Sequence, residues 1–249
     1  QPTAPHPRTR VSHQRHPRLE ELEGMVRSGE IDTLVVAITD MQGRLVGKRV
    51  QAQAFLNGVI DHGAHFCTYL LGTDMEMNTP DGFQLMNWET GYGDWIAQPI
   101  WDQLRILPWL PGTAMVLADT IDEETGLEIP ISPRTILKRQ IARAAEAGYA
   151  LKAGSEFEFY VLQDSWEDMH RNNWAVPRTF GYYNEDYHLL QAPKAEPLHR
   201  LLRNQLTEAG GPIELRKGEA APGPHRAHTP PAPGLGPPPP TRAPPPRPH

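Results

Sequence analysis

Two carboxylates that could do chemistry, Glu156 and Glu158, are separated by one residue in the segment Lys152–Leu162. Aromatic and β-branched residues alternate with polar ones there, which predicts a half-buried strand. Alternate side chains of a strand share a face, so the two glutamates lie on one face, about 6.5–7 Å apart. Like charges at this spacing raise each other's pKa unless a cation lies beside them. The pair could hold Mg²⁺ or Mn²⁺, which prefer oxygen ligands.

The same pair has a second interpretation. The polar face could be ordinary solvated strand surface, with each glutamate paired to a lysine or arginine of a neighbouring strand. The spacing taken alone favours this second interpretation. The opposite face carries Phe157, Phe159 and Val161, which we expect to pack into a core.

The chain before this strand predicts a small sheet with flanking helices. The turn Met41-Gln42-Gly43 joins two β-rich runs into a hairpin. Ser132 is a good N-cap and Pro133 suits the first helical position, so a helix begins there and ends near Gly148. Strands are expected at 31–40, 44–50, 65–71, 106–109 and 114–119, and short helices at 19–28 and 52–63.

The chain after this strand changes character. Residues 166–178 read as irregular, 198–209 as an amphipathic helix and 213–216 as a short strand. From Pro224 onward the composition turns to Pro, Arg, His and Ala, which predicts an unfolded tail. So abrupt a change also suggests a shifted reading frame or a truncated gene. The expected domains are 1–17 (disordered lead-in), 18–128, 129–223 and 224–249 (disordered tail).

Bulk properties exclude several classes of protein. The formal net charge of −6 gives no electrostatic footprint for nucleic acid. Cys67 is the only cysteine, which rules out an internal disulfide and fits a reducing cytosol. No apolar run approaches the roughly 18 residues of a membrane span, and the N-terminus lacks the apolar core of a secretory signal. We therefore expect a cytoplasmic protein with neither nucleic acid nor membrane as partner.

Several stretches in order resemble the glutamine synthetase family: 31–50, 132–148, the run Gly154-Ser155-Glu156-Phe157-Glu158-Phe159, and the run Lys217-Gly218-Glu219-Ala220-Ala221-Pro222-Gly223. Together they cover roughly Ile31–Gly223. The resemblance implies an α+β fold, in which an N-terminal β-grasp-like domain (18–128) precedes the first part of a catalytic β-sheet domain (129–223). It also implies a ring-shaped homo-oligomer.

The resemblance implies a reaction as well. In that family two divalent ions, Mg²⁺ or Mn²⁺, bridge the phosphates of ATP and a glutamate substrate. Glu156 would bind the metal on the ATP side, and Glu158 and Glu219 would bind the other. The γ-phosphoryl group moves onto the glutamate carboxylate, and an amine then attacks the acyl phosphate to give an amide. The ordered motifs argue against an unrelated two-metal hydrolase.

One departure concerns the amine. Members that use ammonia carry an Asp-Gly-Ser-Ser type loop, which is not found in the corresponding region 74–94. This region resembles the bacterial branch that ligates glutamate to larger amines such as polyamines or ethanolamine. Because a carboxylate among aromatic rings suits an alkylammonium, Trp88, Glu89 and Tyr92 form the candidate amine pocket. Alternatively, the loop packs at a subunit contact.

A second departure concerns the metal. Arg226 stands where the family has a further metal-binding glutamate, and an arginine cannot bind a cation. The later motifs of the catalytic domain do not follow it. The alternative to a ligase is therefore a catalytically inactive, truncated protein with an interaction or regulatory role.

Overall fold

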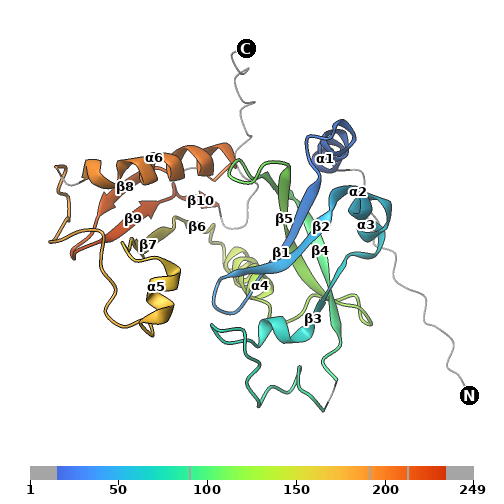
Figure 1. Ribbon diagram of the computed structural model, residues 1–249. Helices are drawn as coiled ribbons and strands as arrows, with labels where there is room; N and C mark the ends of the chain where they lie inside the picture. Colours follow the sequence, from blue (N-terminus) through green and yellow to red (C-terminus); the bar gives the residue numbers. More distant parts are fainter. Residues whose placement is uncertain (1–15, 90, 191, 212, 234–249) are drawn as a thin grey trace, which may run out of the picture. The chain divides into compact units, whose positions relative to one another are not determined.

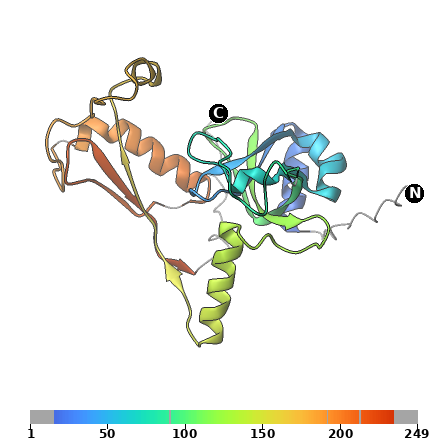
Figure 2. The same cartoon turned by 90° about the horizontal axis from the view of Figure 1, so that it is seen from below.

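The computed structural model describes residues 16–89, 91–190, 192–211 and 213–233. The chain divides into two compact units, Gln1–Ala150 and Leu151–His249, each drawn in Figures 1 and 2. Sequence analysis predicts the domain boundary at 128/129. The structure divides the chain after Ala150, so the helix Pro133–Glu146 is grouped with the first unit. Each unit is described by itself below.

The first unit is built on a mixed five-stranded sheet with the order β2-β1-β5-β4-β3 (Figure 1). Its strands are β1 (Thr33–Thr39), β2 (Leu45–Gln51), β3 (Ala64–Cys67), β4 (Asp94–Ile106) and β5 (Thr113–Asp122). β1 pairs in parallel with β5, and the other three pairings are antiparallel. The last strand of this unit, β5, therefore lies at the centre of the sheet.

Helical segments accompany this sheet. They are α1 (Pro17–Ser28), α2 (Ala52–Ala54), the π-helix η1 (Phe55–Val59), α3 (Ile60–His62), the 3-10 helix η2 (Thr68–Leu71) and α4 (Pro133–Glu146). α4 is held to β5 by ion pairs from Arg134 and Lys138 to Asp119, at 3.0 and 2.7 Å. The sequence prediction of a helix that begins after Ser132 is confirmed, although the Ser132 side chain makes no capping hydrogen bond.

The core of this unit joins the sheet to α1 and to the segment 52–62. Phe55 is 0% exposed and meets the ring of Trp101 edge-on, with centroids 6.2 Å apart. Leu34, Val36 and Val116 are also fully buried. Burying large apolar side chains of this kind supplies most of the free energy that holds a domain together.

The hairpin of β1 and β2 is stabilised by contacts within its turn. The buried Asp40 carboxylate accepts hydrogen bonds from the backbone N–H groups of Gln42 and Arg44, at 3.0 and 2.8 Å, and pairs with the Arg44 guanidinium at 2.7 Å. Gly43 has a positive φ of 82°, which glycine adopts without strain. The hairpin prediction is confirmed.

Strand boundaries are less well predicted. The expected strand at 65–71 ends at Cys67, and the expected strand at 106–109 is wrong, because β4 ends at Ile106 and a turn follows. Sequence analysis missed the 13-residue strand β4 itself. This strand contains Pro99, which argues against a regular strand, and accommodates it beside a register shift between Pro99 and Leu104.

The described part of the second unit contains two small sheets and two helices. β7 (Glu156–Tyr160), β9 (Pro224–His228) and β8 (Leu215–Gly218) form an antiparallel sheet in that order. β6 (Lys152–Ala153) pairs with β10 (Ala232–Pro233). The helices are α5 (Trp166–Arg171) and α6 (Ala192–Glu208), of which α6 lies beside β8 (Figures 1 and 2).

The predicted unfolded tail is wrong for its first part. Pro224–His228 forms β9, the middle strand of the three-stranded sheet, and Ala232–Pro233 forms β10. Strand pairing uses backbone groups that every residue except proline donates, and Pro224 stands at the first position of its strand, where proline is tolerated. The Pro-, Arg-, His- and Ala-rich composition therefore does not predict that this segment joins a sheet. The rest of the predicted tail, 234–249, and the lead-in 1–15 lie outside the described residues.

Two further expectations for this unit need correction. The segment predicted as irregular contains α5, whose N-cap Ser165 accepts a hydrogen bond from the Asp168 backbone at 3.1 Å. The acidic strand is not half-buried: Phe157, expected in a core, is 58% exposed. Of the five residues of β7, only Phe159 is partly buried, and the other four are exposed.

Candidate acidic site

Glu156 and Glu158 lie on one face of β7, as predicted from their spacing. In the β7–β9 register Glu158 is directly opposite Arg226, and Glu156 is opposite His228. Directly paired residues of antiparallel strands point to the same face. Sheet pairing therefore directs the Arg226 side chain toward both glutamates.

Glu219 joins the same cluster from the turn that follows β8. The turn is closed by a hydrogen bond from the Glu219 backbone N–H to the Pro224 carbonyl, at 3.1 Å. This brings Glu219 Oε1 to 2.5 Å from Arg226 Nε. The structure thus places together all three glutamates that sequence analysis selected as metal ligands.

Arg226 fills the space among these three carboxylates. Its Nη1 lies 3.2 Å from Glu156 Oε2, and its Nη2 lies 2.6 Å from Glu158 Oε1. Its Nε donates a hydrogen bond to Glu158 Oε1 at 2.8 Å. The hydrogen bond to Glu158, together with the charges of Glu156 and Glu219, raises the pKa of the Arg226 guanidinium. The group remains a cation at every physiological pH.

Lys217 supplies a second cation at the edge of the cluster. It is opposite Arg226 in the β8–β9 register, and its Nζ lies 3.0 Å from Glu219 Oε1 and 2.6 Å from Asp186 Oδ1. These two carboxylates raise the pKa of the Lys217 ammonium, the hydrogen bond to Asp186 being the larger cause.

The carboxylates in this arrangement do not fit a divalent metal. Mg²⁺ and Mn²⁺ need several oxygen atoms at about 2.0–2.6 Å around one point, and the guanidinium occupies that point. Among the described residues, no group of three or more His, Cys, Asp or Glu side chains is arranged to hold a metal ion. The interpretation in which the glutamates meet an arginine of a neighbouring strand is the one that the structure realises.

The opposite face of the sheet carries a polar cluster that sequence analysis missed. His225 is 2% exposed, and its ring centroid lies 4.7 Å from that of His199 on α6. Both rings line a cavity of about 330 Å³ together with Arg216, and neither ring has a hydrogen-bond partner among the described residues. Burial first, and the Arg216 charge second, lower the pKa of His225 to about 4. The alternation of β9 was the available signal, because it sends His225 to the face away from Arg226.

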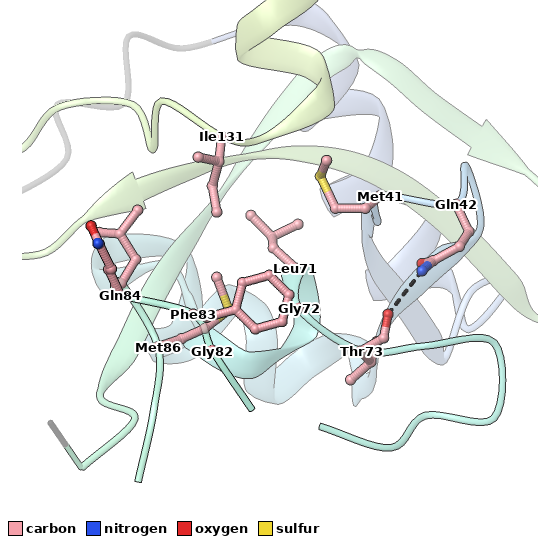
Figure 3. Close-up of a pocket in the computed structure, with 11 residues that line it drawn as sticks. Met41, Gln42, Leu71, Gly72, Thr73, Gly82, Phe83, Gln84, Met86 and Ile131 are labelled. Atoms are coloured by element: carbon pink, nitrogen blue, oxygen red, sulfur yellow. Dashed lines mark hydrogen bonds between the residues drawn. The ribbon is translucent and has the colours of Figure 1, made fainter. Parts of the chain in front are cut away.

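The predicted amine pocket is only partly assembled. The rings of Trp88 and Tyr92 meet edge-on with centroids 6.3 Å apart, but Trp88 is 84% exposed and Glu89 is also exposed. A cavity of about 550 Å³ lies elsewhere in the first unit, and the three predicted residues are not part of its lining (Figure 3).

Figure 3 shows the side chains that line this larger cavity. Leu71, Phe83 and Ile131 give it an apolar wall. One edge is fixed by a hydrogen bond from Gln42 Nε2 to the Thr73 carbonyl oxygen, at 2.9 Å. Walls of this kind suit the apolar part of a small organic molecule.

Comparison with known proteins gives consistent matches. Residues 130–233 match the family model for the catalytic domain of glutamine synthetase. The chain is 44% identical over 207 residues to the gamma-glutamylethanolamide synthetase GlnA4 of Streptomyces coelicolor, covering 83% of this chain and 45% of that protein. It is 29% identical over 213 residues to a glutamate–isopropylamine ligase of a Pseudomonas species, covering 86% of this chain and 46% of that protein.

Solved structures with a similar fold agree with these sequence matches. A complex of GmaS with ADP matches with a TM-score of 0.63 and 23% identity, over 85% of this chain and 44% of that one. A structure described as a novel glutamine synthase homolog matches with a TM-score of 0.64 and 18% identity, over 82% and 44%.

The α+β architecture and the match over 130–233 together define a catalytic domain of the glutamine synthetase type. The chain belongs to the glutamine synthetase family. It spans less than half the length of the two relatives named above, 45% and 46%. Among the described residues, no helix is both long and apolar enough to cross a membrane.

Proposed function

We propose that the protein is an ATP-dependent ligase that joins the γ-carboxylate of glutamate to an amine. ATP phosphorylates the carboxylate to give γ-glutamyl phosphate and ADP, and the amine then displaces phosphate and forms the amide. The observation that carries the proposal is the 44% identity over 207 residues to GlnA4, a gamma-glutamylethanolamide synthetase. The proposal gives Glu156, Glu158 and Glu219 no role as metal ligands, because Arg226 fills the space between them.

The acceptor in this proposal is an amine larger than ammonia, with ethanolamine first and polyamines next. The names of the two relatives, an ethanolamide synthetase and an isopropylamine ligase, support this choice. Trp88, Glu89 and Tyr92 are the proposed contacts, with the carboxylate facing the ammonium group and the aromatic rings beside its carbon chain. The contact between the Trp88 and Tyr92 rings supports a shared role.

A homo-oligomer and a cytoplasmic location complete the proposal, and the domain assignment (18–128 β-grasp-like, 129–223 catalytic) is retained with it. Ile136 and Leu137 on α4 are 42% and 45% exposed, and Phe157 on β7 is also exposed. Exposed apolar residues of each unit favour burial against another protein. Light scattering after gel filtration measures the number of subunits.

A second candidate is supported by the position of Arg226. A family member whose own arginine occupies its acidic cluster would fold without catalysing ligation, and would act through interaction or regulation. Arg226 is only 24% exposed in its side chain and touches all three glutamates, so it is part of the folded sheet.

One assay separates the two candidates. The purified chain is given Mg-ATP, glutamate and, in turn, ammonia, ethanolamine, isopropylamine or putrescine, and released phosphate and γ-glutamyl amide are measured. A ligase releases phosphate only when glutamate and an amine are both present, with one amide per phosphate. A folded chain that releases none with any amine overturns the ligase proposal and leaves the second candidate.

The amine pocket is tested in the same assay. Glu89→Gln removes the proposed ammonium contact, and Glu124→Gln, an exposed glutamate of the same unit, is the matched control. We expect Glu89→Gln to raise the KM for ethanolamine while the control leaves it unchanged. An unchanged preference among the amines in both variants would show that Glu89 does not contact the amine.

A further inference from the structure

Arg226 occupies a position that the strand register forces on it. β9 is the middle strand, so Arg226 has Glu158 opposite on β7 and Lys217 opposite on β8. All three side chains therefore share one face of the sheet. Because a one-residue shift in register would send Arg226 to the other face, its contact with the glutamates is a property of the fold.

The guanidinium uses all three of its nitrogen atoms in this cluster. Nη1 contacts Glu156, Nη2 contacts Glu158, and Nε contacts both Glu158 and Glu219. A planar guanidinium presents five N–H donors in a rigid fork, which matches several carboxylates at once. A lysine would offer one point charge in place of this fork.

We propose that Arg226 is a built-in cation that takes the place of a divalent metal among Glu156, Glu158 and Glu219 and keeps metals out of this site. The carboxylate oxygens that a metal would need already face the guanidinium at 2.5–3.2 Å. An entering ion must expel a positive group that cannot lose its proton, and repels it at close range.

The cluster also has little attraction for phosphate. Lys217 is paired with Asp186 and Glu219, and Arg226 with three glutamates, so these two cations are already matched by carboxylates. An anionic nucleotide brought to this face would meet more negative charge than positive charge.

Calorimetric titration of MnCl₂ into the purified chain tests the proposal. We expect no saturable binding by the wild type and a saturable site in Arg226→Glu, where a fourth carboxylate replaces the cation. Adding Glu158→Gln to that variant should abolish the new site. Arg200→Glu is the matched control, because it makes the same change of charge at an exposed position of α6 and should bind no more Mn²⁺ than the wild type.

Two further variants keep the test decisive. Arg226→Met removes the charge and keeps an unbranched side chain, so it should bind Mn²⁺, whereas Arg226→Lys keeps a cation and should not. Circular dichroism establishes that each variant is folded, and Mn²⁺ should raise the Tm of Arg226→Met but not of the wild type. Saturable binding by the wild type that Glu158→Gln abolishes would overturn the proposal, as would folded Arg226→Glu and Arg226→Met variants that bind no Mn²⁺.

The inference rests on family membership and on the geometry of the cluster, independently of ligase activity. Phosphate release measures the proposed function, and Mn²⁺ titration measures the closed site. A chain that releases no phosphate but binds Mn²⁺ through Glu158 contradicts both proposals. A chain that releases no phosphate and gains Mn²⁺ binding only when Arg226 is removed contradicts the ligase alone.

Discussion

His225 should make the second unit less stable as the pH falls below neutrality. Its ring is buried against His199 and Phe159, with centroid distances of 4.7 and 6.1 Å, and Arg216 lies close enough to repel a second positive charge. Glu185 and Glu196 line the same cavity, but burial and Arg216 prevail and lower the pKa of His225 from 6.5 to about 4. The folded protein therefore keeps this ring neutral where an unfolded chain binds a proton.

The sign and size of the effect follow from proton linkage. Between the two pKa values of 6.5 and about 4 the unfolded state binds more protons than the folded state, so the free energy of unfolding decreases as the pH is lowered. The contribution is negligible at about pH 7.5 and amounts to a loss of about 2 kcal/mol at pH 5. At pH 6.5 the loss is only about 0.4 kcal/mol.

Urea unfolding followed by circular dichroism measures this loss. The wild type and His225→Phe are compared between about pH 5 and pH 7.5, and the difference between them isolates one titrating group from all others. We expect the wild type to lose about 2 kcal/mol more than the variant over this range. Parallel pH profiles for the two proteins would refute the buried neutral histidine. His225→Gln serves as a second non-titrating variant.

Two predictions concern the first unit. Phe55→Ala removes a side chain that is fully buried against Trp101, and should lower the free energy of unfolding by about 3–5 kcal/mol in a denaturant titration. Gly47→Ala places a Cβ atom 2.1 Å from the Val36 carbonyl oxygen, which forces β2 away from β1, and should lower the stability by about 1–3 kcal/mol in a thermal melt. The exposed Gly24, which has open space around its Cα, is the control, and an equal loss in Gly24→Ala would contradict the steric explanation.

The features that sequence analysis predicted correctly are those set by local chemistry. The hairpin depends on Asp40 and Gly43, which lie within its own turn, and α4 depends on Pro133 at its start. The alternation of β7 correctly places Glu156 and Glu158 on one face. In each case residues only a few positions apart determine the result.

The features that it missed depend on distant partners. Glu158 and Arg226 are 68 residues apart, and composition gives no sign that a Pro- and His-rich segment will pair with β7. Sequence analysis identified Arg226 as a departure from the metal-binding pattern, but the register that brings it to the glutamates appears only in the fold. The burial of His225 has the same origin, because it depends on α6 lying over that face of the sheet.

β5 is the last strand of the first unit to be synthesised and the one at the centre of its sheet. Until it is made, the β1–β2 hairpin and the β3–β4 pair are separate pieces, each with an unpaired edge. The parallel pairing that joins them begins with Thr33 opposite Thr113, a long-range contact of the kind that folds slowly. At about 5–20 residues per second, a ribosome needs roughly 4–15 s to pass from the end of β1 to the start of β5. Until Thr113 is synthesised, the nascent chain would expose the unpaired edges of the β1–β2 hairpin and of the β3–β4 pair to other proteins, and would depend on chaperones during this interval.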